Sequence, residues 1–102
     1  MQTESNTNQR PTSARFPLGQ TYITPGAEEA LMIAGQTGIE FLRRHMSGDF
    51  GELTNEDMQE NELSLREGFR VLSAYRTAKG EKLWIITEAN RSSTTILVPD
   101  EY

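Results

Sequence analysis

The sequence predicts an α+β domain, in which two to three N-terminal helices pack on a three- to four-stranded antiparallel β-meander. Two observations predict this class. Between residues 24 and 69, apolar residues recur every three or four positions, which is the spacing of amphipathic helices. After Phe69 the period falls to two, in segments 70–75, 82–87 and 94–98, which are rich in β-branched and aromatic residues.

Residues 1–15 are expected to form a disordered polar tail, and residues 16–102 a single folded domain. The tail has no large apolar residue after Met1, so it cannot contribute to a core. It also lacks the apolar centre of a signal peptide, and no run approaches the roughly 18 apolar residues of a membrane span. A soluble, cytoplasmic protein is therefore expected.

The predicted helices have clear start and stop signals. Thr24 precedes Pro25 as the N-cap of the first helix, and Gly35 suits its C-terminal cap. Thr37 and Glu40 match a capping box for the second helix, which ends near Gly48. Thr54 caps the third helix, whose inward-facing residues are predicted to be Met58, Asn61, Leu65 and Phe69.

Asn61 is the one polar residue on the inward face of the third helix. We expect its buried amide to bond to backbone groups, in preference to a functional contact. The strands that follow form two hairpins. Gly80 supplies the positive φ of the first turn, and segment 88–94 forms the loop of the second.

The last two strands should present alternate residues to the helices. Leu83, Ile85 and Ile96 are predicted to face them, whereas Lys82, Trp84 and Glu88 face away. Trp84 should therefore be only partly buried, either half-exposed or covered by Tyr22 of the 16–23 segment. At the second hairpin, Asn90 suits a left-handed conformation, and Arg91 should lie at the tip, free of the core, with Glu88 as its candidate partner.

The charge distribution is uneven. The formal charge is −5, yet the stretch from Gly48 to Leu65 holds six acidic residues and no Lys or Arg. Such a stretch is either a solvated face that aids solubility or a docking surface for a basic partner. In the second interpretation, Phe50 and Trp84 serve as apolar contacts, and the charge is carried by Asp49, Glu52, Glu56, Glu60 and Glu62.

His45 is the only histidine, so any imidazole chemistry must use it. It lies at the predicted end of the second helix, where its simplest role is to bond free carbonyls. The alternative is a phosphodiesterase site in which Asp49 orients His45. The wider candidate set for such catalysis is His45, Arg76, Glu88 and Arg91. The second hairpin loop is either purely structural or part of an anion pocket built from Arg76, Arg91 and the loop hydroxyls.

Other chemistry has little support in the sequence. The absence of cysteine rules out disulfides and thiolate metal sites, and the carboxylates show no metal-ligand spacing. We expect no cofactor and no metal. The ten basic residues are scattered among fifteen acidic ones, so direct nucleic-acid binding is not expected.

Four segments carry a resemblance to known proteins. In chain order they are TPGAEEAL, RHMSGDFG, SAYR and KLWIITEANRSSTTILVPDEY. They resemble a group of small bacterial proteins from plasmids and other mobile elements, some labelled with restriction-system names. The resemblance covers about residues 16 to 102. It implies a mobile-element context and no particular activity, so no catalytic residue is transferred. This chain also lacks the glycine motif that binds a methyl donor.

Two functions from different classes follow. The first is a non-enzymatic, acidic interaction protein of a mobile element. It would bind and modulate or inhibit a basic host nucleic-acid-handling or defence assembly, in an anti-restriction or anti-CRISPR-like manner. The alternative is a small ribonuclease toxin, because helices followed by an antiparallel meander resemble, in outline only, the barnase-like and RelE-like toxins.

Overall fold

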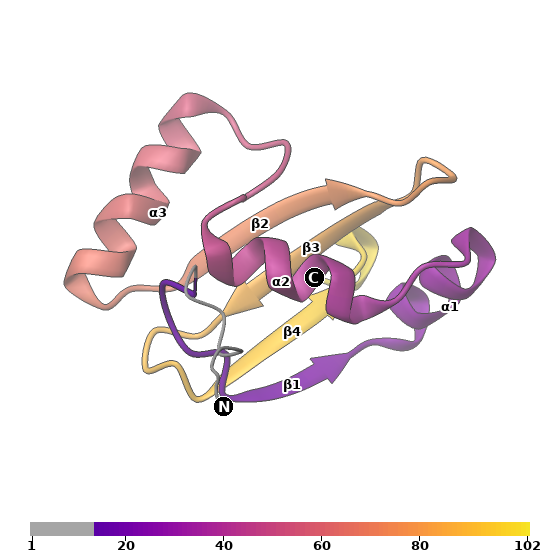
Figure 1. Ribbon diagram of the computed structural model, residues 1–102, viewed down its shortest axis with the longest axis horizontal. Coiled ribbons are helices and arrows are strands. Elements are labelled where there is room, and N and C mark those ends of the chain that lie inside the picture. Colours follow the sequence, from indigo (N-terminus) through magenta and orange to yellow (C-terminus); the bar gives the residue numbers. More distant parts are fainter. Residues whose placement is uncertain (1–13) are drawn as a thin grey trace, which may run out of the picture.

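The computed structural model describes residues 14–102, which form one four-stranded sheet with three helices (Figure 1). Of the predicted disordered tail, residues 1–15, the first thirteen lie outside the described part of the chain, whereas Arg15 is held by a backbone bond to the Met46 carbonyl (2.7 Å) and by an ion pair with Glu62. The elements in chain order are β1 (Gln20–Ile23), α1 (Pro25–Ala34), α2 (Gly38–Ser47), α3 (Asn55–Glu67), β2 (Val71–Arg76), β3 (Lys82–Thr87), β4 (Ser93–Leu97) and the short 3₁₀ helix η2 (Pro99–Glu101).

The strand order of the sheet is β1-β4-β3-β2. β2, β3 and β4 form the predicted antiparallel meander. The prediction is wrong for β1, which pairs in parallel with β4 from Gln20 opposite Ser93 to Ile23 opposite Ile96. The cause is the long connection between β1 and β2. It carries all three helices and places the two strands at opposite edges, where both run in the same direction as β4.

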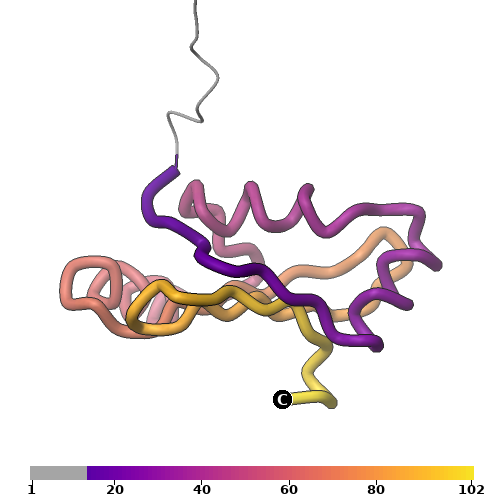
Figure 2. Tube along the Cα trace, turned by 90° about the horizontal axis from the view of Figure 1, so that it is seen from below, coloured from indigo at the N-terminus to yellow at the C-terminus, as the bar shows by residue number. Residues whose placement is uncertain are grey.

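α2 lies across one face of the sheet, here called the inner face, and α1 lies at the end of the strands, with Ala27, Ala30 and Leu31 in the same core cluster (Figure 1). Figure 2 shows α2 on this side and the C-terminal segment on the other. As predicted, Leu83, Ile85 and Ile96 are buried on the inner face, where they pack with Leu31 of α1 and Phe41 of α2. The burial of such side chains stabilises the fold by about 1.5–3 kcal/mol each.

Local signals set most of the helix ends. The Thr24 hydroxyl accepts a hydrogen bond from the N–H of Ala27, and Gly35 ends α1 with φ +68°. The Thr54 hydroxyl likewise accepts the N–H of Asp57 at the start of α3. The capping box predicted at Thr37 is wrong, because the Thr37 side chain makes no capping bond there.

α3 does not lie on the inner face with α2. It lies beside the edge of the sheet, against β2 (Figures 1 and 2). Asn61 makes this contact, because its amide donates to the carbonyl of Leu72 (2.6 Å) and accepts the N–H of the same residue (3.1 Å). The prediction that Asn61 is a buried amide bonded to backbone is therefore confirmed.

The contact along an edge also explains two wrong predictions. Met58 is 36% exposed and Phe69 is 54% exposed, although both were expected to face inward. An edge contact buries only a narrow stripe of α3, namely Asn61 and Ser64. Gly68, with φ +82°, ends the helix before Phe69 and turns the chain away from that stripe.

The β2 edge is also closed at Ala74. The Ala74 N–H donates to the carbonyl of Phe50 (3.1 Å), and the Ala74 carbonyl accepts the N–H of Glu52 (2.7 Å). The backbone groups of Leu72 and Ala74 that point away from β3 are thus all bonded. At the opposite edge of the sheet, all four residues of β1 are exposed.

η2 holds the C-terminal segment on the outer face, opposite α2. The Glu101 carboxylate accepts the N–H of Gly26 (2.9 Å) and the hydroxyl of Thr24 at the start of α1, and these bonds lower its pKa. The attachment places Tyr102 over the outer face, where its ring meets Trp84. Among residues 14–102, no helix combines the length and apolar character needed to cross a membrane.

Candidate functional site

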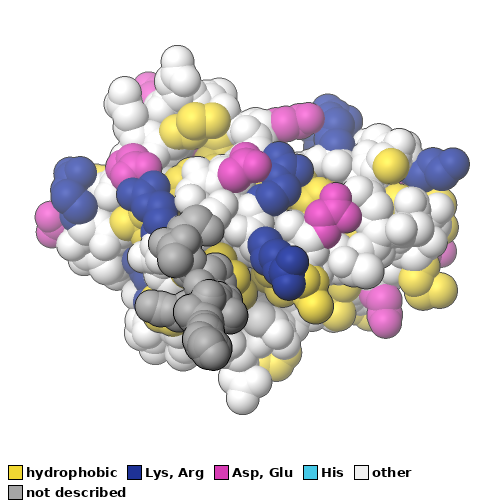
Figure 3. Space-filling model, in the orientation of Figure 1, with side chains coloured by type: hydrophobic (Ala, Val, Ile, Leu, Met, Phe, Trp, Pro, Cys, Tyr) yellow, Lys and Arg dark blue, Asp and Glu magenta, His cyan; other side chains and the backbone are white. Residues whose placement is uncertain are grey.

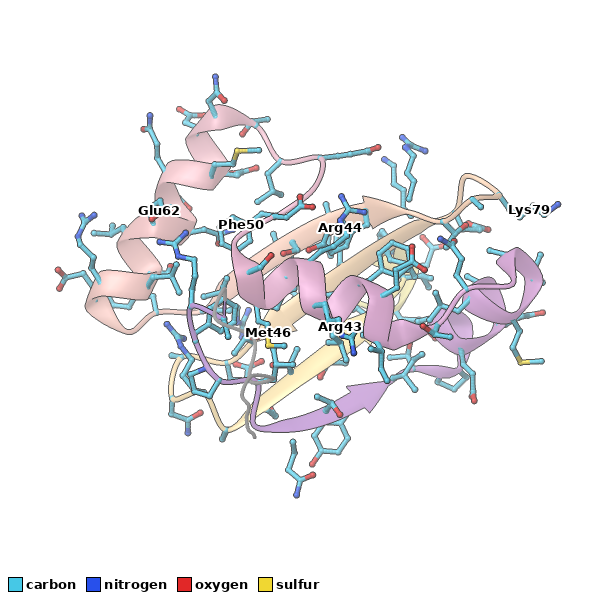
Figure 4. All side chains as sticks on the ribbon, viewed as in Figure 1. Arg43, Arg44, Met46, Phe50, Glu62 and Lys79 are labelled. Carbon is cyan, nitrogen blue, oxygen red and sulfur yellow. The ribbon has the colours of Figure 1, made fainter. Side chains whose placement is uncertain are left out.

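Three of the five predicted acidic contact residues are engaged in ion pairs. Asp49 pairs with Arg44 (2.7 Å), Glu52 with Arg76 (3.1 Å) and Glu62 with Arg15 (2.8 Å). The hydrogen bonds from these arginines hold the pKa values of Asp49 and Glu62 below their usual range. Figure 4 shows Glu62 on α3 and Arg44 on α2. Charge of both signs is accordingly interspersed on this side of the molecule (Figure 3).

Of the acidic residues in the stretch from Gly48 to Leu65, those without an ion pair lie on α3. Glu56, Asp57 and Glu60 are exposed, and none forms an ion pair with any base in residues 14–102. Asp57 and Glu60 lie three positions apart, so they share one side of the helix. We call Glu56, Asp57 and Glu60 the acidic face. It is smaller than the sequence predicted and includes Asp57, which was not among the predicted contact residues.

Phe50 is not the exposed anchor that was predicted. It is 4% exposed and packs with Phe16 and Val71 in a second core cluster. The cause is the fold of the next residue. Gly51 has φ +77° and lies so close to the Ala74 carbonyl that any side chain at residue 51 would collide with it. This approach holds the loop against β2 and turns Phe50 inward.

Trp84 is only partly buried, as predicted, and lies on the outer face. Its cover comes from Tyr102, whose ring meets Trp84 edge to face at 5.6 Å between centroids. Tyr22 cannot supply it, because β1 lies at the far edge of the sheet beyond β4. Arg70 donates to the Tyr102 hydroxyl (3.0 Å) and so holds the tyrosine in place.

Next to Trp84, the outer face is hollowed where α3 meets the sheet. Three adjoining hollows of about 440, 250 and 320 Å³ share Leu72 in their linings. Together they form one depression, which we call the Leu72 groove. Its floor comes from β2 and β3, α3 and Leu53 form one wall, and Tyr102 lies on the other side. The main lining residues are Leu53, Asp57, Glu60, Phe69, Leu72, Ala74, Trp84, Ile86 and Tyr102.

The electrostatic character of the groove is set by which charges are paired. Arg70 pairs with Glu88 (3.3 Å), and Arg76 with Glu52. Lys82 lines one end, and in the described part of the chain it has no ion-pair partner. Along the α3 wall, the free charges are those of Asp57 and Glu60. This wall therefore favours cations beside an apolar floor.

His45 belongs to the core. It is 0% exposed, and its ring bonds to the hydroxyls of Ser73 (Nδ1, 2.5 Å) and Thr87 (Nε2, 2.9 Å). Asp49 does not orient it, since that carboxylate bonds Arg44. Burial lowers the pKa of His45 to about 3. The imidazole is therefore neutral at neutral pH and has no contact with solvent.

The direction of these hydrogen bonds can be deduced. The Thr94 hydroxyl donates to the carbonyl of Leu18 (2.7 Å), so it accepts from Thr87 (2.7 Å). Thr87 has then used its proton, so His45 must donate from Nε2 and accept from Ser73 at Nδ1. Every polar atom of the imidazole has a partner. This arrangement is a structural core network, and a buried Ser–His pair without access to substrate cannot act as a nucleophile and base.

Arg91 is bound to backbone and does not lie free at the hairpin tip. It has φ +60°, the conformation expected of Asn90. Its guanidinium donates to the carbonyls of Ser64 (3.1 Å), Phe69 (2.6 Å), Glu88 and Ala89. The Ser64 carbonyl lies in the last turn of α3, where it also accepts the N–H groups of Gly68 (2.8 Å) and Phe69 (3.1 Å). Arg91 thus joins α3 to the β3–β4 hairpin.

The structure does not bring the four candidate catalytic residues together. Arg76 lies opposite Lys82 at one end of the sheet, whereas Glu88 and Arg91 lie at the other end, beyond Thr87. Glu88 bonds Arg70, and His45 is enclosed in the core. The anion pocket expected from Arg76 and Arg91 is therefore not formed.

Leu72, Ala74, Tyr102 and Arg70 line the groove but were not among the predicted site residues. The alternation along 71–76 could have placed Leu72 and Ala74 on the same side as Trp84, whereas nothing local in the sequence places Tyr102 there. Within residues 14–102, no group of three His, Cys, Asp or Glu side chains could hold a metal ion. Comparison with protein-family models, curated proteins and solved structures finds no match for this chain.

Proposed function

We propose that this chain is a non-enzymatic interaction protein that binds a basic surface of another protein through the acidic face and the Leu72 groove. The observation that carries the proposal is the position of free carboxylates, Asp57 and Glu60, along one wall of a depression whose floor includes Leu72 and Trp84. Complementary charge speeds association and selects the partner. Burial of the tryptophan and its neighbours supplies affinity, because aromatic residues and arginine dominate interface energetics.

The same charges favour a protein partner over nucleic acid. Asp57 and Glu60 repel phosphates, and Arg70 and Arg76 beside the groove are paired with carboxylates. A basic surface that normally holds phosphates is therefore the best complement. In the mobile-element context that the resemblance implies, we propose a host nucleic-acid-handling or defence assembly as this partner, with modulation or inhibition as the outcome. No observation favours the ribonuclease alternative, so we do not propose it.

Charge reversal of the acidic face tests this function. The variant Glu56→Lys/Asp57→Lys/Glu60→Lys should lose capture of basic proteins from a nuclease-treated bacterial lysate, because its α3 wall becomes cationic. Captured proteins are identified by mass spectrometry, and circular dichroism checks the fold. The matched control Glu28→Lys/Glu29→Lys/Glu81→Lys changes the net charge equally at exposed positions that do not line the groove.

The control variant should retain capture as the wild-type protein does. If the acidic-face variant captures the same basic proteins at the same yield, the acidic face has no part in binding. If the two variants lose capture equally, the effect is one of net charge alone, and the proposed site is wrong.

A further inference from the structure

The Leu72 groove also indicates the form of the segment that binds there. We infer that its occupant is a basic amphipathic α-helix of the partner, about three turns long. This inference rests on the proposed function and makes it more specific. It follows from three features of the groove, namely the closed β2 edge, the apolar floor and the charge of the α3 wall.

The closed β2 edge excludes pairing as an added strand. An extended peptide that joins a sheet gains its affinity from main-chain bonds to the edge strand. Here the free backbone groups of Leu72 are taken by Asn61, and those of Ala74 by Phe50 and Glu52. An extended peptide in the groove would leave its own N–H and C=O groups without these partners. An α-helix satisfies its backbone groups internally, so it suits this groove.

The apolar floor suits one face of such a helix. Leu72, Ala74, Trp84 and Ile86 lie on the outer face of neighbouring strands, with Leu72 opposite Ile86 and Ala74 opposite Trp84. This part of the sheet has no helix over it, and Tyr102 borders it. The groove extends along the six residues of β2, a length of about 17 Å. At 1.5 Å per residue, this length corresponds to about 11 helical residues.

The charge of the α3 wall determines which charge the polar residues of the bound helix should carry. Asp57 and Glu60 line the wall, and neither is paired within the part of the chain that the structure describes. Lys or Arg residues on the flank of the bound helix would meet them. The exposed helix α3 of a second copy of this chain is a poor occupant. It is itself acidic, so Asp57 and Glu60 of the α3 wall would repel it.

Synthetic peptides on the full-length protein test the form of the occupant. The probe is a 14-residue Leu/Lys peptide patterned as an amphipathic helix. It is compared with a peptide of the same composition in strict Leu–Lys alternation, which favours an extended chain, and with a helical Leu/Glu peptide. Because Trp84 is the only tryptophan, its emission reports directly on the groove.

The helical Leu/Lys peptide should bind saturably and shift Trp84 emission to the blue. The alternating peptide should bind the wild-type protein at least tenfold more weakly than the helical Leu/Lys peptide does. The Asp57→Lys/Glu60→Lys variant should bind the helical Leu/Lys peptide at least tenfold more weakly than the wild-type protein does. The Leu/Glu peptide should not bind. If the alternating peptide binds as tightly as the helical one, or if the helical peptide binds without a change in Trp84 emission, the inference is overturned. If both Leu/Lys peptides bind with equal affinity and the Leu/Glu peptide does not bind, the helical form of the occupant is contradicted. The proposed role of the acidic face in binding would still stand. A failure of the proposed function would appear instead as no binding of any basic peptide.

Discussion

Lowering the pH from 7 to 5 is expected to reduce the unfolding free energy of this protein by about 2 kcal/mol through His45 alone. The folded pKa of His45 is lowered to about 3 by burial, whereas an unfolded histidine titrates near its ordinary value of 6.5. Between these two values, the unfolded chain binds a proton that the folded chain does not. Stability is therefore fully present above about pH 6.5 and falls as the pH decreases toward 3.

Two properties of the chain isolate this effect. His45 is the only histidine, so no other imidazole titrates between pH 7 and 5. The carboxylates with lowered pKa values, such as Asp49 and Glu62, lose their contributions only at more acidic pH. Urea unfolding at a series of pH values measures the slope. The His45→Gln variant, which cannot titrate here, should be less stable at pH 7 and nearly independent of pH down to pH 5.

NMR of the His45 imidazole tests the same hydrogen-bond network independently, because it measures the tautomer and the titration of the ring. We expect one tautomer, with the proton on Nε2, and no titration of the ring signals in folded protein at pH 5. A folded protein whose imidazole titrates near pH 6.5, or a wild-type stability that does not change between pH 7 and 5, would contradict the buried network.

The Asn61→Leu substitution should lower the unfolding free energy by about 2–4 kcal/mol, because it leaves the N–H and C=O of Leu72 without partners at a buried site. Both groups bond the Asn61 amide, and this amide is the main polar contact between α3 and β2. Leucine has a similar size but can neither donate nor accept. The change should also increase the hydrogen-exchange rate of the Leu72 amide.

Gln59→Leu provides the matched control. Gln59 is exposed on the same helix, so its replacement should change stability by no more than about 0.5 kcal/mol. Asn61→Leu should in addition weaken peptide binding in the groove, because the α3 wall loses its attachment while its charges stay unchanged. Equal stabilities of the two variants, with unchanged protection of the Leu72 amide, would show that Asn61 does not hold α3 to the sheet.

The parts of the fold that depend on local signals could be predicted from the sequence. Thr24 and Thr54 cap their helices by bonding groups three residues away, and Gly80 turns the first hairpin with φ +88°. The alternation in β3 correctly placed Leu83 inward and Trp84 outward. The parallel pairing of β1 could not be found in this way, because the pattern of a four-residue strand carries no information about its neighbour.

The candidate site could be predicted only in part, for a similar reason. The sequence located the acidic stretch, but the neutralisation of Asp49, Glu52 and Glu62 depends on arginines that the fold brings from other elements. Charge counted along the chain therefore overestimated the acidic surface. Arg91 was placed in solvent because the carbonyls of Ser64 and Phe69, at the end of α3, become its neighbours only after folding.

Site-specific photo-crosslinking from the groove tests the central claim most directly. A benzophenone amino acid replaces Leu63, which is 41% exposed and lines the groove on α3, or Lys79, which lies on the β2–β3 turn away from it (Figure 4). In bacterial cells, we predict a protein adduct from position 63 that maps to a Lys/Arg-rich amphipathic segment and disappears with Glu56→Lys/Asp57→Lys/Glu60→Lys. Position 79 should give no such adduct. The same adducts from both positions, or adducts from position 63 that survive the charge reversal, would contradict the claim that the acidic face and the Leu72 groove form the binding site.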